Sequence, residues 1–368
     1  MRLIVDARYT RTSQHDGISR FTAGLIEALA RHHDVRMLIS DDAQLPMLPA
    51  VPYTKVTSPT SALEPLVALQ VNRLDPDVVF SPMQTMGSWG RKYALVLTLH
   101  DLIYYQHRTP PGFLPAPVRL LWRLFHLAYW PQRVLLNRAD VVATVSETTK
   151  GLITGHRLTK RPISVIYNAA GEASEPRDLA VPPARELLYM GSFMEYKNVE
   201  TLIGAMELLP GYRLHLLSGI RPERLEQLRA LVPAGADVVF HEGVDEDEYQ
   251  RLLRSVTASI TLSRSEGFGI PLVEAMRAGT PMIANNIEIF REVGRDAVDY
   301  VDGDDAEAVA AAVKKLEDPA LFAARSAAGL ARAADFSWER SAESLWGSAR
   351  EAVALHTRGQ GRPADRDW

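Results

Sequence analysis

Short runs of consecutive apolar residues alternate along the chain with longer segments whose apolar residues recur at helical spacing. The first run is RLIVD at 2–6, and after Gly17 apolar residues repeat on one helical face from Ile18 to Leu29. Strands that are covered on both faces read as such continuous apolar runs. Further runs lie at 35–40, 77–81, 94–101, 140–146 and 163–168. The pattern predicts a parallel sheet covered by helices.

The same alternation restarts after GEASEPRDLAVPPAR at 171–185, a segment rich in Pro, Ala and charge that is typical of a linker. Apolar runs then follow at 186–192, 212–219, 237–243, 258–263, 280–285 and 297–301. Two successive arrays predict an α/β protein with two Rossmann-like, doubly wound parallel-sheet domains, at 1–170 and 171–336. Ligands bind at the carboxyl ends of the strands in such sheets, so we expect the site in a central cleft that the two domains face.

Composition narrows the class of protein. The chain has 368 residues, of which 46% are hydrophobic and 23% charged, as in an ordinary soluble globular protein of two domains. It contains no cysteine, which excludes disulfides and cysteine-based metal sites. The start, MRLIVDARYT, lacks the apolar run of a signal peptide, and no apolar stretch approaches the length of a membrane-spanning helix. We therefore expect a cytoplasmic protein.

Charge is distributed unevenly between the two halves. Residues 1–170 hold 19 Lys and Arg against 12 Asp and Glu, a net charge of +7, whereas the remainder has a net charge of −11. A basic half suggests contact with something anionic. Chance variation between two ordinary domains is an equally good explanation.

One segment of the basic half, PVRLLWRLFHLAYWPQRVLLNR at 117–138, interleaves arginines with large apolar residues. A basic amphipathic helix of this kind fits an anionic membrane surface, but it also fits a helix packed into the core with snorkelling arginines. We favour packing for most of the apolar residues, and peripheral contact of the first domain with the inner membrane surface stays open. The basic and aromatic residues are not grouped as a nucleic-acid surface requires, so we expect no nucleic-acid partner.

The stretch SRSEGFGIPLVEAMRAGTPMIA places two glutamates, Glu266 and Glu274, on either side of a glycine loop between a strand and a helix. Gly267 and Gly269 leave the backbone amides open to a ligand, and a helix N-terminus favours negative charge. Carboxylates can accept hydrogen bonds from sugar hydroxyls, and backbone amides can bind phosphates. The two features in one loop suggest a nucleotide sugar as the ligand. The alternative is an ordinary glycine loop of an α/β protein.

The segment from Glu266 to Glu274 resembles the E-x7-E motif of retaining glycosyltransferases of family 4, which have the GT-B fold, and the continuation AMRAGTPMIANNIEIFREV is also similar. The resemblance extends from Asp16 to Trp338. It implies that Glu274 binds the ribose of the donor nucleotide and that Glu266 contacts the donor sugar as a catalytic group. The loop residues that complete the expected donor site are Gly267, Phe268, Gly269 and Ile270.

MGSFMEYKNVETL resembles the diphosphate-binding turn of that family, in which an arginine usually follows the glycine. Here Ser192 follows Gly191, while the lysine of the turn is present as Lys197. A lysine can hold a phosphate as a point charge, and the resemblance gives Lys197 a catalytic role beside the leaving diphosphate. The absent arginine implies weaker diphosphate binding or another cation, Arg264 or Arg20.

Two segments of the first domain also resemble the family. TLHD ends a strand, and the resemblance places His100 against the donor sugar at the reaction centre, with Asp101 on the acceptor side. HDGISR resembles the N-terminal loop in which a glycine approaches the donor phosphates, which is Gly17 here. Asp16 and Arg20 of the same loop are expected on the acceptor side.

The resemblance as a whole implies a retaining, metal-independent hexosyltransferase that needs no cofactor besides its donor. GDP-mannose is the favoured donor, UDP-sugars stay open, and the acceptor is a glycan or a lipid-linked sugar. The fold implies that a helix at 337–355 packs back on the first domain, and the polar tail at 356–368 is expected to be disordered. A nucleotide-sugar epimerase with the same fold and a catalytically silent sugar-binding protein are the alternatives.

Overall fold

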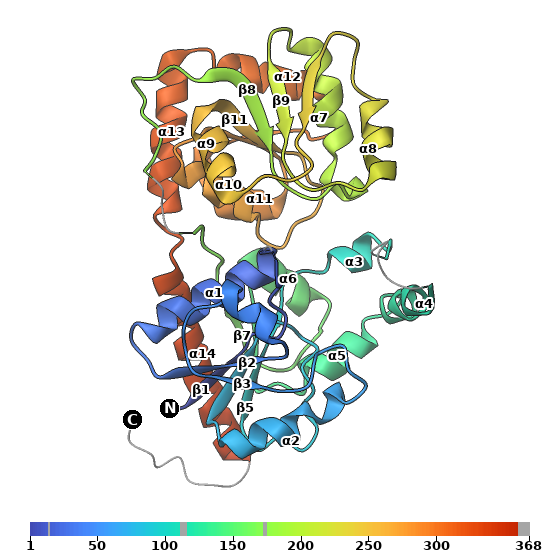
Figure 1. Ribbon diagram of the computed structural model, residues 1–368, viewed down its shortest axis with the longest axis vertical. Helices are drawn as coiled ribbons and strands as arrows, with labels where there is room; N and C mark the ends of the chain where they lie inside the picture. The colour runs from blue at the N-terminus through green and yellow to red at the C-terminus, as the bar shows by residue number, and fades with distance from the viewer. Residues whose placement is uncertain (14, 111–115, 172–174, 360–368) are drawn as a thin grey trace. The chain divides into compact units, whose positions relative to one another are not determined.

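The computed structural model describes residues 1–13, 15–110, 116–171 and 175–359 (Figure 1). The chain forms two compact units. The first consists of Met1–Ala169 together with the residues from Ser337 onward, and the second consists of Ala170–Phe336. The first unit is therefore discontinuous in sequence.

The first unit is built on a seven-stranded parallel sheet with the order β3-β2-β1-β4-β5-β6-β7. Its central strands are wholly buried because helices cover both faces, which explains their unbroken apolar sequences. The strands are β1 (Leu3–Asp6), β2 (Val35–Ile39), β3 (Tyr53–Lys55), β4 (Val78–Ser81), β5 (Ala94–Leu99), β6 (Val141–Thr144) and β7 (Ile163–Val165).

The sequence pattern did not predict β3. This strand has only three residues, Tyr53–Lys55, and pairs with β2 at the edge of the sheet. Its side chains are exposed or half-buried, so it needs no apolar run to be stable. Short, polar edge strands are common because they discourage pairing with other chains.

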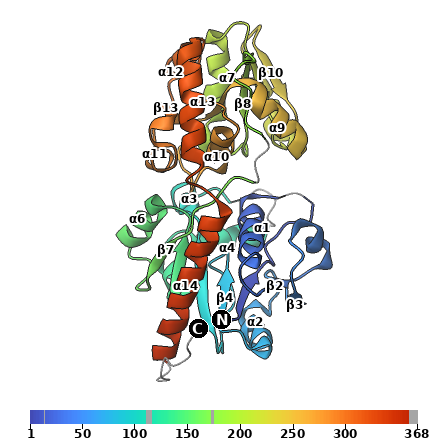
Figure 2. The same cartoon turned by 90° about the vertical axis from the view of Figure 1, so that its left-hand side faces the viewer.

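The helices of the first unit cover both faces of the sheet (Figures 1 and 2). Asp16 caps the first of them, since its side chain accepts a hydrogen bond from the Ser19 amide. The α-helices are α1 (Gly17–Ala30), α2 (Val67–Val71), α3 (Ile103–Gln106), α4 (Ala116–Phe125), α5 (Trp130–Leu136), α6 (Glu147–Gly155) and α14 (Trp338–Gly359). The described residues of this unit also form the short 3₁₀ helices η1 (Asp42–Met47), η2 (Glu64–Leu66) and η3 (Asn72–Leu74).

The last helix, α14, packs on α1 and β5 of the first unit (Figure 2). Its first residue, Trp338, lies so close to α1 that a Cβ atom on Gly24 would come within 2.4 Å of the indole. The hydroxyl of Ser341 donates to the Tyr167 carbonyl at 2.6 Å. The helix continues to Gly359, so the expectation of a disordered tail from residue 356 is wrong for residues 356–359, and residues 360–368 lie outside the described part of the chain.

The segment 117–138 forms α4 and α5 rather than one helix, and the prediction that most of its apolar residues pack into the core is wrong. Most of its large apolar side chains are exposed, whereas Leu136 is buried. In the described parts of the chain, no helix is both long enough and apolar enough to cross a bilayer.

The second unit has a six-stranded parallel sheet with the order β10-β9-β8-β11-β12-β13. The prediction of two doubly wound parallel sheets is thus confirmed. The strands are β8 (Ala184–Tyr189), β9 (Arg213–Leu216), β10 (Asp237–Phe240), β11 (Val256–Thr261), β12 (Met282–Asn285) and β13 (Val298–Val301). The helices are α7 (Val199–Ala205), α8 (Pro222–Arg229), α9 (Glu246–Ser255), α10 (Ile270–Arg277), α11 (Glu288–Gly294), α12 (Ala306–Lys315) and α13 (Pro319–Ala333), with 3₁₀ helices η4 (Glu195–Lys197), η5 (Met206–Leu208) and η6 (Arg295–Ala297).

Candidate functional site

The glycine loop of the second unit joins β11 to α10, and Gly269 determines its shape. Gly269 has a φ of +94° and directly precedes α10, with Pro271 in the first turn of the helix. A Cβ atom at this position would lie 2.9 Å from Cε1 of Phe290, so both the backbone angle and the space require glycine. The first amides of α10 have no partner within the helix, which makes this end suited to an anion.

Lys197 and Glu266 meet beside this loop. Lys197 ends η4, which follows β8, and Glu266 follows β11, which is the neighbour of β8 in the sheet. The Lys197 ammonium lies 2.5 Å from the Glu266 carboxylate. Each side chain exposes 15% of its area, so the pair is shielded but within reach of a ligand. The two catalytic candidates of the second unit therefore form an ion pair at the carboxyl edge of the sheet.

Glu274 is buried within α10, with 6% of its surface exposed. The hydroxyl of Tyr249, on α9, donates a hydrogen bond of 2.8 Å to its Oε2. A buried carboxylate requires such partners because it has lost its hydration. Tyr249 was not predicted as a site residue, since the periodicity of α9 marks it only as one more core residue beside Leu252 and Leu253.

Side chains of β8 itself and of later segments hold the turn that follows this strand. The amide of Gly191 donates to the Ser218 hydroxyl at 3.1 Å, and the Tyr189 hydroxyl donates to the Ser192 carbonyl at 2.6 Å. Arg224, near the start of α8, donates from Nε to the Phe193 carbonyl at 2.9 Å. Ser192 itself is exposed. The turn therefore has a fixed backbone although it lacks the arginine usual in the resembling family.

Arg264 braces the segment that carries Lys197. Its guanidinium forms an ion pair with Asp304, donates to Oδ1 of Asn198 at 3.0 Å and donates to the Glu195 carbonyl at 3.2 Å. Arg264 was one of two candidates to replace the absent arginine, and these contacts already engage its charge. Asn198 directly precedes α7, but its side chain forms no capping hydrogen bond with that helix, and its amide donates to the Gly303 carbonyl at 2.6 Å.

The remaining loop residues differ in exposure. Gly267 and Phe268 are buried, while Ile270 is partly exposed. The ring of Phe268 packs edge-on against Phe336, with 5.5 Å between the ring centroids. Any contact of Phe268 with a donor must therefore come from its backbone, and its ring anchors the loop.

In the first unit, His100 follows β5 and lies against α1. Its Nε2 is 2.7 Å from the Pro82 carbonyl, and its ring packs edge-on against Phe21 with 5.3 Å between centroids. Burial lowers the pKa of His100 below its ordinary value, because desolvation disfavours the imidazolium. A carbonyl only accepts hydrogen bonds, so Nε2 carries the proton and Nδ1 of the neutral ring is left as an acceptor.

The acceptor-side candidates of this unit have structural partners. Asp16 caps α1 and also accepts from Nε of Arg11 at 2.8 Å, and its charge acts on the imidazole of His100. Oδ1 of Asp101 accepts from the Ile103 amide at 2.9 Å. The other two candidates belong to α1, with Gly17 exposed and Arg20 half-buried.

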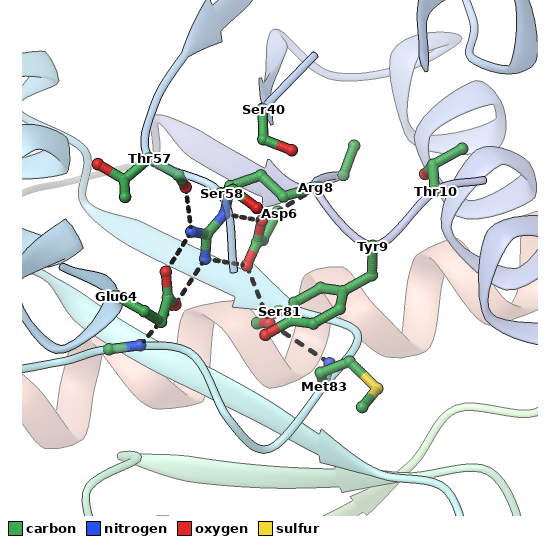
Figure 3. A network of polar contacts seen from close by, with 12 residues as sticks. Asp6, Arg8, Tyr9, Thr10, Ser40, Thr57, Ser58, Glu64, Ser81 and Met83 are labelled. Carbon is green, nitrogen blue, oxygen red and sulfur yellow. Dashed lines mark hydrogen bonds and ion pairs between the residues drawn. The ribbon is translucent and has the colours of Figure 1, made fainter. Parts of the chain in front are cut away.

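A buried ionic network at the end of β1 was not predicted (Figure 3). Nε and Nη2 of Arg8 donate to the two oxygens of Asp6 at 2.7 and 2.9 Å, and Nη1 donates to Glu64 at 2.6 Å. Burial alone would lower the pKa of the Arg8 guanidinium, but the two carboxylates raise it above its ordinary value. The Gly87 amide also donates to Glu64, at 3.0 Å. The network fixes the strand ends around β1 and leaves little of these groups exposed.

Two sequence families match the chain. The family described as "Glycosyltransferase Family 4" matches residues 15–170, and the family "Glycosyl transferases group 1" matches residues 174–328. The chain is 33% identical over 267 residues to the O-antigen chain mannosyltransferase B of Escherichia coli, covering 66% of this chain and 67% of that protein. It is 25% identical over 322 residues to the O-antigen chain mannosyltransferase RfbU of Salmonella typhimurium, covering 82% of this chain and 87% of that protein.

Solved structures show the same fold. The sucrose-phosphate synthase of Thermosynechococcus elongatus superposes with a TM-score of 0.73 at 20% identity, covering 96% of this chain and 99% of that one. Anabaena HepE, in a structure with UDP-glucose, superposes with a TM-score of 0.69 at 16% identity, covering 95% and 99%. The fold and the sequence matches agree: this chain belongs to the family 4 glycosyltransferases, which have the GT-B fold of two Rossmann-like domains.

Proposed function

We propose that this glycosyltransferase moves a hexose, with retention of configuration, from a nucleotide-diphosphate sugar to a glycan or a lipid-linked acceptor. The observation that carries the proposal is the Lys197–Glu266 ion pair, which lies beside the N-terminus of α10. This edge offers a cation and helix amides for a diphosphate, and a carboxylate for sugar hydroxyls.

The proposed step breaks the bond between C1 of the sugar and the diphosphate oxygen, and the electron pair stays with the diphosphate. Lys197 and the first amides of α10 stabilise the charge that develops there. The acceptor oxygen forms its bond to C1 on the face that the diphosphate leaves, and its proton passes to a phosphate oxygen. Glu266 orients the sugar without becoming a covalent nucleophile. This scheme needs no metal ion.

The ion pair suggests how donor binding prepares the site. Without a donor, Lys197 and Glu266 satisfy one another at 2.5 Å. A diphosphate carries more negative charge than a carboxylate and competes for the ammonium. Glu266 is then released to accept hydrogen bonds from the sugar, while Glu274, which Tyr249 holds by one oxygen, accepts from the ribose.

The names of the relatives favour mannose as the sugar and GDP-mannose as the donor. Two of them are O-antigen chain mannosyltransferases. A UDP-sugar is the second candidate, because the structural neighbour HepE was solved with UDP-glucose. We assign the acceptor to the first unit, beside Asp16 and Arg20 at the start of α1 and Asp101 after β5. On the donor side of this unit we expect Nδ1 of His100 to accept a hydrogen bond from the donor sugar and Gly17 to approach the donor phosphates.

A thermal-shift panel with GDP, GDP-mannose, UDP and UDP-glucose tests the donor. A ligand that binds only the folded protein raises its melting temperature. We expect a rise with GDP and GDP-mannose, and a rise with UDP compounds alone would replace the donor while keeping the class of enzyme. The variants Lys197→Ala and Glu274→Ala should lose the rise, whereas the matched control Lys314→Ala, which changes an exposed lysine of α12, should keep it. Absence of any rise would contradict the proposal.

Two further measurements separate transfer from the alternatives. An epimerase would change the donor sugar without an acceptor, which nuclear magnetic resonance of the donor detects. A silent sugar-binding protein would show the thermal shift but release no nucleotide diphosphate when extracts that contain glycan or lipid-linked acceptors are added. Transfer predicts acceptor-dependent release that Glu266→Gln abolishes.

A further inference from the structure

The part of the first unit between Asp101 and Asp140 contains no acidic residue. Over residues 102–139 the only ionisable side chains apart from tyrosines are basic. They are Arg108, Arg119, Arg123, Arg133, Arg138, His107 and His126. The basic charge of the first half is therefore concentrated on the segment that includes α4 and α5.

Helix α4 and the turn that follows it have two different apolar faces. On the inner face, Trp122 packs edge-on against Tyr104, with 5.0 Å between ring centroids, and His126 packs against Tyr105 at the same distance. These contacts attach α4 to α3. Trp122 and His126 are only half-buried, so these contacts cover only part of the apolar surface of α4.

The outer face consists of further large apolar residues that repeat at helical spacing and continue into α5. Their exposed fractions range from 46% for Val134 to 67% for Leu121. We call this set the outer apolar face, and it comprises Leu120, Leu121, Leu124, Leu127, Trp130 and Val134. Single exposed leucines are ordinary, but six large exposed apolar side chains within residues 120–134 indicate an interaction site. Figure 1 shows α4 at the margin of the first unit.

We propose that the outer apolar face docks this protein on a bilayer that contains anionic lipids. The helices are too short to span a membrane, since α4 has 10 residues and α5 has 7. A short helix with leucines on one face and arginines beside them is suited to the interface, where the leucines enter the acyl region and the arginines reach the phosphates. Arg123 lies within one turn of Leu120, Leu124 and Leu127, and supplies that charge.

Charge complementarity selects the lipid surface over other occupants. A second copy of this chain would place the same face, with the same arginines and no carboxylates, against itself, and like charges would oppose such a symmetric contact. Nucleic acid would complement the arginines but not six exposed apolar side chains. An anionic bilayer complements both features. The proposal does not depend on the donor or on the chemistry that we assign to the second unit.

Vesicle flotation of the full-length protein tests the proposal. Vesicles of phosphatidylcholine alone are compared with vesicles of equal parts phosphatidylcholine and phosphatidylglycerol. We expect binding to the anionic vesicles that weakens with salt. In Leu121→Gln/Leu124→Gln we expect the affinity for these vesicles to fall about tenfold or more, because two leucines that would be buried in the acyl region are lost. The control Leu179→Gln/Leu231→Gln changes two leucines of the second unit with exposures of 48% and 49%, and should bind like the parent protein. Arg123→Gln should weaken binding, whereas Arg36→Gln, at the one exposed residue of β2, should not.

A site-specific label gives an independent readout, because the protein has no cysteine. An environment-sensitive fluorophore on Leu124→Cys should shift its emission to the blue with anionic vesicles, and one on Leu231→Cys should not. No binding to either vesicle, equal shifts at both labels, or a stable dimer in solution that Leu121→Gln/Leu124→Gln dissociates would each overturn the proposal. Thermal unfolding of each variant checks that it is folded, and the nucleotide shift described above reports on the second unit separately.

Discussion

Replacing Tyr249 by phenylalanine probes the group that holds Glu274. The change removes one hydroxyl and keeps the aromatic ring, which is 1% exposed. Oε2 of Glu274 then loses a hydrogen bond of 2.8 Å in a position that is 6% exposed, where little water is available to replace it. A buried hydrogen bond to a charged group contributes about 1.5–3 kcal/mol. For a unit of this size each kcal/mol corresponds to about 2–4 °C, so we expect the melting temperature of the second unit to fall by roughly 3–12 °C.

The same variant should also weaken nucleotide binding, because Glu274 is no longer held in one orientation. A loss of about tenfold in Kd corresponds to 1.4 kcal/mol, within the energy of the missing hydrogen bond. Isothermal titration with the nucleotide that stabilises the parent protein measures this affinity, and calorimetry of the free protein measures the melting temperature.

Tyr212→Phe is the matched control. Its hydroxyl also donates to a glutamate, Glu317, at 3.1 Å, but that carboxylate has 42% of its side chain exposed and can be rehydrated. We expect a stability loss below about 1 kcal/mol and unchanged nucleotide affinity. If Tyr249→Phe lowers the melting temperature but leaves the affinity unchanged, Glu274 is not a nucleotide ligand. If neither quantity differs from the control, the hydrogen bond does not contribute as we reason.

Three other predictions concern stability. Arg8→Met leaves two buried carboxylates without their cation and should cost about 3–5 kcal/mol in urea unfolding, and a cost under about 1 kcal/mol would show that the network is not needed. Gly269→Ala should cost about 1–3 kcal/mol for the φ of +94° plus the clash at 2.9 Å, whereas Gly235→Ala, at a φ of +81° with no described atom within 4 Å of the added Cβ, should show only the backbone part. Because burial lowers the pKa of His100 from its ordinary 6.5, the unfolded chain binds its proton at a higher pH than the folded protein. The free energy of unfolding should therefore decrease as the pH falls through 6.5, and His100→Gln should remove part of that decrease in unfolding titrations across this range.

Local sequence patterns identified most of the sheet. The runs that became β1, β4 and β5 are continuous and largely apolar, because both of their faces are covered, and such runs stand out in any sequence. The sequence did not predict β3, because an edge strand with exposed side chains has no continuous apolar run. The glycine loop before α10 was also located correctly, since a positive φ at Gly269 and a proline in the first turn leave a local trace in the sequence.

The contacts between residues of the candidate site could not be predicted from local sequence patterns. Lys197 and Glu266 are far apart in the chain, and their contact exists because β8 and β11 are neighbours in the sheet. Tyr249 reads as a core residue of α9, and only the packing of α9 near α10 directs its hydroxyl to Glu274. The network of Arg8 likewise depends on segments that meet only in the folded unit.

The sequence alone determined most of the strands, that two parallel sheets form, and where the glycine loop lies, because periodicity and turn chemistry act over a few residues. The tertiary structure decided which charges meet, where α14 returns, and that the leucines of α4 face outward. An amphipathic pattern states that a helix has an apolar face, but it is the same whether that face meets a core or a membrane. Burial is a property of neighbours brought from elsewhere in the chain, and only the fold supplies or withholds them.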